Sequence, residues 1–236
     1  MSGFPHKQVR LMRANIKLMA SAGIKLLMGL VLVGLLIFLP AGTMDYPNGW
    51  LFMAVLFVPM LIAGVVMAVC SPQLLKKRLN TKEKESEQKS VVAMSGIMFI
   101  AAFVVAGLNY RYVWTVMPSW AVWSAVALFL LSYAMYAEVM RENAYLSRTI
   151  EVQEGQTVIE TGLYGIVRHP MYSATILLFL SMPLVLGSLP SFVIMLVYIP
   201  LIVKRIKNEE KVLLAGLDGY EAYCGKVKYR LLPFVW

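Results

Sequence analysis

One polar stretch of this chain has side chains suited to ligand binding, and it lies between two long apolar segments. Residues 160–172 read ETGLYGIVRHPMY and include Tyr164, Arg168, His169 and Tyr172. Proline disfavours helix at the residue before it, and Pro170 suits the first position of the apolar helix that follows. The N–H groups and positive dipole at such a helix start favour an anionic group such as a carboxylate. We interpret residues 160–172 as the wall of a ligand site at the membrane surface.

A second polar set follows the last apolar segment. Arg205 and Glu209 are four residues apart and share one face of the predicted helix, and Glu210 comes next. Taken alone, this pair fits an arginine at a lipid boundary with a solvated salt bridge. Because both polar sets flank neighbouring membrane helices on the same side, we expect them to form one composite site.

Several other kinds of chemistry are not supported. The other histidine, His6, is far away in the sequence, and Cys70 and Cys224 lack metal-ligand spacing, so we expect no metal. Ser173 lacks the elbow motif of a serine nucleophile. Gly162 and Gly165 form no GxGxxG after a strand, which excludes a Rossmann-type cofactor domain.

The composition indicates the fold class. Of the 236 residues, 59% are apolar and 15% charged, and the mean hydropathy is +0.69. The apolar residues form long blocks, whereas an outer-membrane barrel would show short alternating segments. The sequence therefore predicts an all-α, polytopic integral membrane protein.

The apolar blocks predict about six membrane-crossing helices. We expect them at about residues 24–39, 50–69, 91–108, 120–137, 171–186 and 192–203, the first beginning near Ala14 and the fourth continuing to Glu142. The last two are short for a bilayer and fit a tight hairpin bent by Pro183 and Pro200. Residues 76–90 fit a solvated connector, residues 109–114 an interfacial aromatic loop, and residues 148–156 a polar excursion turning at Gly155.

The distribution of charge predicts the topology. With six crossings, all of the 22 Lys and Arg except Arg111 fall on one side, which indicates that both termini are cytoplasmic. The net charge of +9 then reflects topology and contact with anionic membrane lipids, so we expect no nucleic-acid partner.

Together these motifs resemble the isoprenylcysteine carboxyl methyltransferase family, to which membrane phospholipid methyltransferases are related. The resemblance covers about residues 138–236 and rests on TGLY at 161–164, RHPMY at 168–172, RIKNEE at 205–210, GYEAY at 219–223 and YRLLP at 229–233. It divides the chain into N-terminal transmembrane helices one to four (1–137) and a methyltransferase-like region (138–236). Ser173-Ala174 and Leu217-Asp218-Gly219 depart from the family's usual glycine and Phe-Gly positions.

The resemblance implies S-adenosylmethionine as cofactor and assigns roles by position. Arg205, the residue we assign to catalysis, is implied to lie near the substrate. The implied cofactor-binding residues are Gln156, Thr157, Val158, Ile159, Tyr164, His169, Pro170, Met171, Tyr172 and Glu209.

Our leading hypothesis is a membrane methyltransferase acting on a lipid-like or prenylated substrate, by carboxyl O-methylation of the isoprenylcysteine type. Methyl transfer from a sulfonium depends mainly on positioning, and Arg205 suits a substrate carboxylate. The alternatives are a phospholipid or amine N-methyltransferase, an NADPH-dependent sterol-type reductase, and a non-enzymatic scaffold or transporter. No charge lies in the middle of an apolar segment, which disfavours transport.

Overall fold

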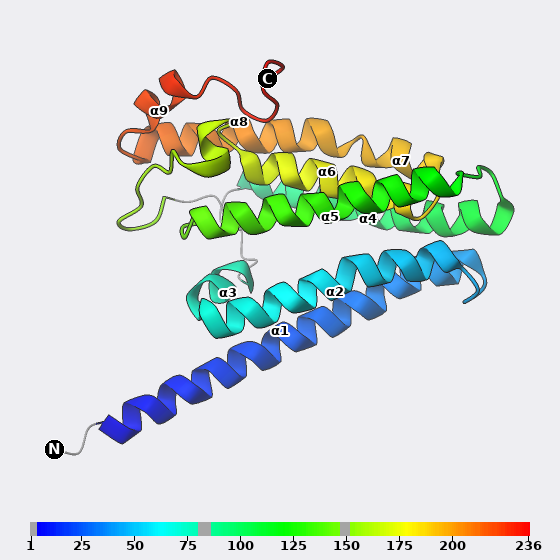
Figure 1. The fold of residues 1–236 in the computed structure, drawn as a ribbon, viewed down its shortest axis with the longest axis horizontal. Coiled ribbons are helices and arrows are strands. Elements are labelled where there is room, and N and C mark those ends of the chain that lie inside the picture. The colour runs from blue at the N-terminus through cyan, green and yellow to red at the C-terminus, as the bar shows by residue number, and fades with distance from the viewer. Residues whose placement is uncertain (1–3, 80–85, 147–151) are drawn as a thin grey trace.

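The computed structural model describes residues 4–79, 86–146 and 152–236, and within these ranges every regular element is a helix (Figure 1). This confirms the predicted all-α fold. The helices are α1 (Phe4–Ala41), α2 (Pro47–Cys70), α3 (Pro72–Leu79), α4 (Ser86–Tyr112), α5 (Ser119–Glu142), the 3-10 helix η1 (Gly162–Gly165), α6 (Pro170–Val185), α7 (Leu189–Met195), α8 (Tyr198–Gly216) and α9 (Tyr220–Lys226).

Five helical stretches of the described chain are long and apolar enough to cross a membrane, so the protein is a polytopic membrane protein. They are residues 17–41, 47–70, 89–112, 119–142 and 189–216. The sixth predicted segment, α6, has 16 residues and is about 24 Å long, less than the roughly 30 Å of a bilayer core. Six full crossings therefore stay a prediction.

The predicted final membrane helix has one irregular turn in the structure, where the backbone angles stay helical. It consists of α7 and α8, with a turn at residues 196–197. Pro200 lies in the first turn of α8, where its ring disfavours the helical position of the carbonyl four residues earlier, that of Leu196. The turn after α6 uses Gly187 at φ +76°, and the Ser188 N–H donates to Pro183 O at 2.9 Å. The α6–α7 pair thus forms the expected hairpin.

Two predicted loops are partly helical, so those predictions were wrong in part. Residues 76–79 of the expected connector belong to α3, which begins at Pro72 and buries Leu75. Residues 86–90 belong to α4, and residues 80–85 lie outside the described residues. Residues 109–112 continue α4, and Asn109 is buried there and donates from Nδ2 to Gly187 O at 3.3 Å. The turn at Gly155 is present at φ +70°, although residues 147–151 of that excursion lie outside the description.

Small residues allow α1 and α4 to pack closely. A Cβ on Gly107 of α4 would lie 2.4 Å from Ile37 O of α1, and Ala106 is fully buried beside it. Membrane helices use such small residues because lipid supplies no hydrophobic force between them. The core continues through Phe52 and Phe129, whose rings meet edge to face with centroids 6.2 Å apart.

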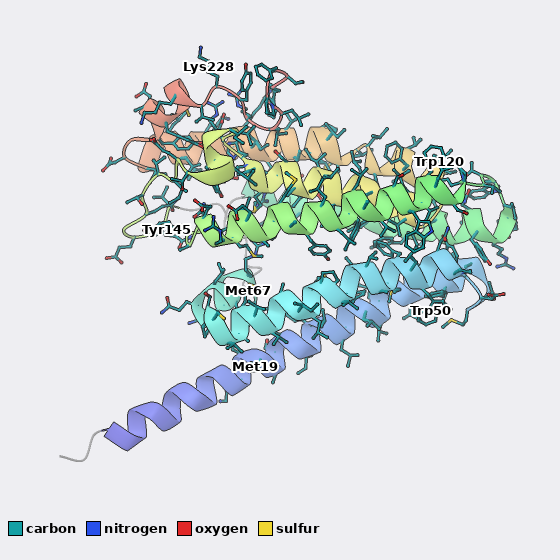
Figure 2. All side chains as sticks on the ribbon, in the orientation of Figure 1. Met19, Trp50, Met67, Trp120, Tyr145 and Lys228 are labelled. Carbon is teal, nitrogen blue, oxygen red and sulfur yellow. The ribbon has the colours of Figure 1, made fainter. Side chains whose placement is uncertain are left out.

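The two ends of the helices differ in chemistry. Figure 1 shows α3, α9 and the start of α1 at one end, and the α1–α2 and α4–α5 turns at the other. Trp50 and Trp120 lie at the second end, opposite Tyr145 (Figure 2), and both are more than half exposed, as expected for aromatic residues at a lipid interface. The start of α6 and the end of α8 reach the first end, which places the two predicted polar sets together.

Candidate functional site

A pocket opens at this first end, between the segment before α6 and the helices α8 and α9. Its empty space, including the open mouth, is about 840 Å³. It is lined by residues of four regions: the residues just after α5, the irregular segment 156–159, η1 with the start of α6, and α8 with the residues that follow. These are Asn143, Tyr145, Leu146, Gln156, Thr157, Val158, Ile159, Tyr164, Arg168, His169, Met171, Tyr172, Arg205, Glu209, Leu213, Leu217, Tyr220 and Tyr223.

The pocket gathers nine of the ten residues that the resemblance implied for the cofactor, together with Arg205. Pro170 is the exception. It is the first residue of α6, as predicted, and it is fully buried behind the pocket wall. Pro170 therefore begins the helix, and its neighbours His169 and Met171 line the pocket.

Tyr172 connects the arginine and the glutamate on α8. Its hydroxyl donates to Glu209 Oε2 and accepts from Arg205 Nε at 3.0 Å. The tyrosine is 4% exposed, so these bonds form largely away from water. Because Tyr172 bonds to both side chains, the carboxylate of Glu209 and the guanidinium of Arg205 are held near each other in the pocket.

Glu210 is the centre of a buried ionic cluster behind the pocket. Its Oε1 lies 3.1 Å from Arg168 Nε and 3.2 Å from His169 Nε2, and its Oε2 accepts from Arg230 Nε at 2.7 Å. Glu209 and Glu210 are consecutive on α8, so one carboxylate faces the pocket while the other fixes the His-Pro segment. The structure commits Nε2 of His169 to this cluster.

The C-terminal tail adds backbone bonds to the same segment. The N–H of Arg168 donates to Tyr229 O at 2.9 Å, and the N–H of His169 donates to Arg230 O at 2.9 Å. Ser173 Oγ donates to Leu231 O at 2.7 Å. The polar residues before α6 are therefore held by the far end of the chain as well as by α8.

An aromatic wall closes the side of the pocket toward α5. Asn143, the residue after α5, donates from Nδ2 to Tyr164 OH at 2.9 Å. Burial raises the pKa of Tyr164 to about 12, against the smaller lowering effect of the Asn143 hydrogen bond. Tyr223 OH donates to Tyr164 O at 2.7 Å, and burial raises its pKa above the ordinary value. Both phenols are therefore neutral at physiological pH.

Tyr220 is a polar group without a partner. It is 4% exposed and lines the pocket, and its hydroxyl makes no hydrogen bond within the described structure. A buried hydroxyl without a partner is costly, and one that lines a pocket is available to a ligand.

Sequence reasoning did not assign several residues that build the site. Glu210 was part of the RIKNEE motif, yet adjacency in sequence does not show which of two glutamates faces a pocket. Tyr220 and Tyr223 were quoted within GYEAY without a role. Asn143 had no signal beyond its place after the predicted helix. In the described residues, no three His, Cys, Asp or Glu side chains are grouped as a metal site would need.

The comparison with curated proteins gives a partial relative. The chain is 31% identical over 91 residues to the Delta(14)-sterol reductase TM7SF2 of Mus musculus. That match covers 37% of this chain and 22% of the reductase, so this chain aligns with about a fifth of the relative's length.

The comparison with protein families concerns the part of the chain that holds most of the pocket. The sequence model of the isoprenylcysteine carboxyl methyltransferase (ICMT) family matches residues 125–215, which run from within α5 to the end of α8. These residues contain the His-Pro segment and the arginine and glutamates of α8. The resemblance is thereby confirmed: residues 125–215 of this chain are similar to the isoprenylcysteine carboxyl methyltransferase family.

Proposed function

We propose that this protein uses S-adenosylmethionine to methylate a carboxyl group on a lipid-like or prenylated substrate at the membrane surface. One observation carries the proposal: Tyr172 holds Arg205 and Glu209 together in the pocket that the family-matched region builds. The observation matters because the cationic methyl donor favours a negative side chain beside it, and the carboxylate acceptor favours a positive one. Glu209 and Arg205 supply these two charges at adjacent positions.

The pocket residues fit this cofactor. S-adenosylmethionine combines an aromatic base, ribose hydroxyls, an amino-acid end and a sulfonium cation. Tyr164 and Tyr172 offer aromatic surface, and Glu209 is an acceptor for hydroxyl or ammonium groups. The unpartnered Tyr220 hydroxyl supplies a buried polar group that a ligand would satisfy. The irregular segment from Gln156 to Ile159 borders the pocket, and its backbone would complete the cofactor site.

The chain's own residues act by positioning. When bound, S-adenosylmethionine supplies an electrophilic methyl group. A carboxylate acceptor is ionised at neutral pH, so the site needs no strong base, in agreement with an arrangement in which His169 is bonded to Glu210. Arg205 is held by Tyr172 and presents a planar fork that suits a carboxylate. Holding two reactants in register can contribute on the order of 7–11 kcal/mol to lowering a barrier.

We further propose that the site faces the cytoplasm, that both termini do so, and that residues 138–236 form the methyltransferase region. The grouping of all Lys and Arg except Arg111 on one side supports this orientation. The boundary at residue 138 falls inside α5, so the two regions share that helix.

Calorimetry of S-adenosylmethionine binding in detergent tests the cofactor assignment. We expect wild-type protein to bind, and Glu209→Gln to bind at least tenfold more weakly because a charged acceptor is lost. Glu221→Gln, which changes an exposed glutamate of α9, should bind like the wild type. Absence of binding to the wild type, or equal binding by the Glu209 and Glu221 variants, would contradict the proposal.

Two alternatives remain testable in the same preparation. An amine-bearing phospholipid acceptor would not need Arg205, so Arg205→Gln should reduce methylation of carboxylate acceptors and spare that of amines. The partial similarity to a sterol reductase favours NADPH as a competing cofactor. Thermal stabilisation by NADPH, without any by S-adenosylmethionine, would support the reductase.

A further inference from the structure

Four consecutive exposed apolar residues follow α9 in the C-terminal tail. Leu232, Phe234 and Val235 are 56, 88 and 76% exposed, and Pro233 between them is exposed as well. No large apolar side chain of the described residues is more exposed than Phe234. The four residues, here called the tail strip, lie outside the candidate membrane spans. Apolar side chains that gather on a surface in this way mark a site of interaction.

The tail is closed into a loop that presents the tail strip outward. The N–H groups of Arg230 and Leu231 both donate to Trp236 O at 2.9 Å, and the guanidinium carbon of Arg230 lies 5.2 Å from the centre of the Trp236 ring. Leu231 is buried in the main core, and Trp236 packs against the same core. Both sides of the tail strip are therefore fixed to the protein, while the strip itself faces outward.

Phe234 has a backbone conformation that phenylalanine rarely adopts. Its φ of +65° lies in the left-handed region, which is unfavourable for a bulky residue. Its ring has the Tyr229 ring as a neighbour, with centroids 5.2 Å apart, and is otherwise open to the surroundings. Strained residues gather at sites of binding. Burial of the Phe234 ring in an apolar environment outside the protein would offset the cost of this conformation.

The tail strip lies at the level where the membrane helices begin. Ser173, in the first turn of α6, donates to Leu231 O at 2.7 Å. At the same turn Tyr172 meets Arg205 of α8, close to the end of the apolar stretch 198–203. Figure 1 shows the tail running back from α9 along α8 to this level. The tail strip is thus beside the transition from apolar to polar helix, which is the position of the lipid headgroups.

The residues around the tail strip indicate that its partner is an anionic membrane surface. Lys228 is exposed and lies at the outer edge of the tail in Figure 2, and Lys204 and Lys207 of α8 are exposed too. Lysines attract anionic lipids, and apolar side chains beside them enter the layer below the headgroups. Tyr229 and Trp236, which flank the strip, are the residue types enriched at this depth. A second copy of the chain fits less well, because lysine is depleted at protein–protein interfaces.

We propose that the tail strip inserts into the headgroup region of an anionic membrane and thereby holds the His-Pro segment in place. The connection is direct, because Tyr229 O and Arg230 O accept the N–H groups of Arg168 and His169. These two carbonyls belong to the same loop as the strip, so a strip fixed in the membrane fixes the acceptors. The inference does not depend on which ligand the pocket binds.

Quenching of a fluorescent label by spin-labelled lipid tests the membrane contact. Cys70→Ser and Cys224→Ser remove the native cysteines, and bimane is then attached at Val235→Cys or, as the control, at Ala222→Cys on α9. Both positions are exposed, and α9 lies at the outer end of the molecule in Figure 1. The protein is reconstituted in vesicles of phosphatidylcholine and phosphatidylglycerol with a nitroxide near the top of the acyl chain. We expect quenching at Val235 to be at least about threefold stronger than at Ala222, because interfacial segments lie at that depth.

The preference for lipid charge is tested with the same label. Spin-labelled phosphatidylglycerol should quench the label at Val235 more strongly than spin-labelled phosphatidylcholine. Lys228→Gln should lower this preference about fivefold, the effect of one lysine near an anionic surface. Lys76→Gln is the matched control, because Lys76 is an exposed lysine of α3, on the side of the molecule away from the tail in Figure 1, and it should leave the preference unchanged.

Hydrogen exchange tests the effect on the His-Pro segment. In anionic vesicles, Leu232→Ser with Phe234→Ser should speed exchange of the Arg168 and His169 amides at least about tenfold, because the loop that holds them opens more often. Val116→Ser, which changes an equally exposed apolar residue between α4 and α5, should leave those rates unchanged.

The possible results are distinct. Equal quenching at Val235 and Ala222 would overturn the membrane contact. A disulfide-linked dimer through the Val235→Cys thiol, without quenching by lipid, would also overturn it and would identify a second copy as the partner. Quenching at Val235 with unchanged exchange at Arg168 and His169 would overturn the link to the His-Pro segment. S-adenosylmethionine is absent from both experiments, so failure of the proposed function would leave their results unaffected.

Discussion

Glu210→Gln is the change for which the structure gives the clearest magnitude. The substitution keeps the shape of the side chain and removes its negative charge. It leaves Arg168, whose side chain is 8% exposed, without its counter-charge. Breaking a buried ion pair from one side costs about 3–5 kcal/mol. Arg230 is 34% exposed and adds little, because water screens it.

We expect a loss of about 3 kcal/mol, at the lower end of that range, because the amide oxygen of glutamine still accepts a hydrogen bond. For a chain of this size, each kcal/mol shifts the melting temperature by about 2–4 °C. The expected decrease is therefore about 6–12 °C. The cluster joins α8 to the His-Pro segment and to the tail, so the decrease should be accompanied by weaker cofactor binding.

The assay is thermal unfolding of the purified protein in detergent, followed by circular dichroism. Glu154→Gln, which changes an exposed glutamate in the turn before the pocket segment, is the matched control and should shift the midpoint by less than 2 °C. Adding Arg168→Met to Glu210→Gln should recover part of the loss, because it removes the unpaired buried charge. A shift for Glu210→Gln as small as that of the control would refute the reasoning.

Two other predictions concern packing and pH. Gly107→Ala should destabilise the protein by about 1–3 kcal/mol, because its Cβ would meet the backbone of α1. Gly96→Ala on the same helix has open space around it and should stabilise the protein by up to about 1 kcal/mol. Equal midpoints of thermal unfolding for the two variants would contradict this prediction. The folded-state pKa of Tyr164 is raised from about 10 to about 12, so its contribution to stability is fully present below pH 10 and is lost, by about 3 kcal/mol, as the pH rises from 10 to 12. Ultraviolet absorbance titration should therefore show one tyrosine fewer ionising near pH 12 in Tyr164→Phe than in the wild type, and an equal titration at that pH would contradict the assignment.

Most of the fold follows from local patterns in the sequence. Long apolar blocks require helices because lipid offers no partner for backbone N–H and C=O groups, and the structure has helices at each predicted block. The errors occurred where charge and helix coexist. Residues 76–79 are polar enough for a loop, yet Leu75 is buried on the same short helix. The irregular turn before α8 depends on the position of Pro200, which hydropathy does not show.

What the sequence by itself determined is the helix start at Pro170 and the common helix face of Arg205 and Glu209, because proline chemistry and a four-residue spacing act over a single turn. The resemblance supplied most of the other predicted pocket residues. What only the tertiary structure decided is how those residues are paired. Tyr172 joins Arg205 to Glu209, and Glu210 turns instead toward Arg168, His169 and Arg230, contacts that bring together parts of the chain far apart in sequence. Burial and ion pairing depend on which helices meet, and that information is spread over the whole chain.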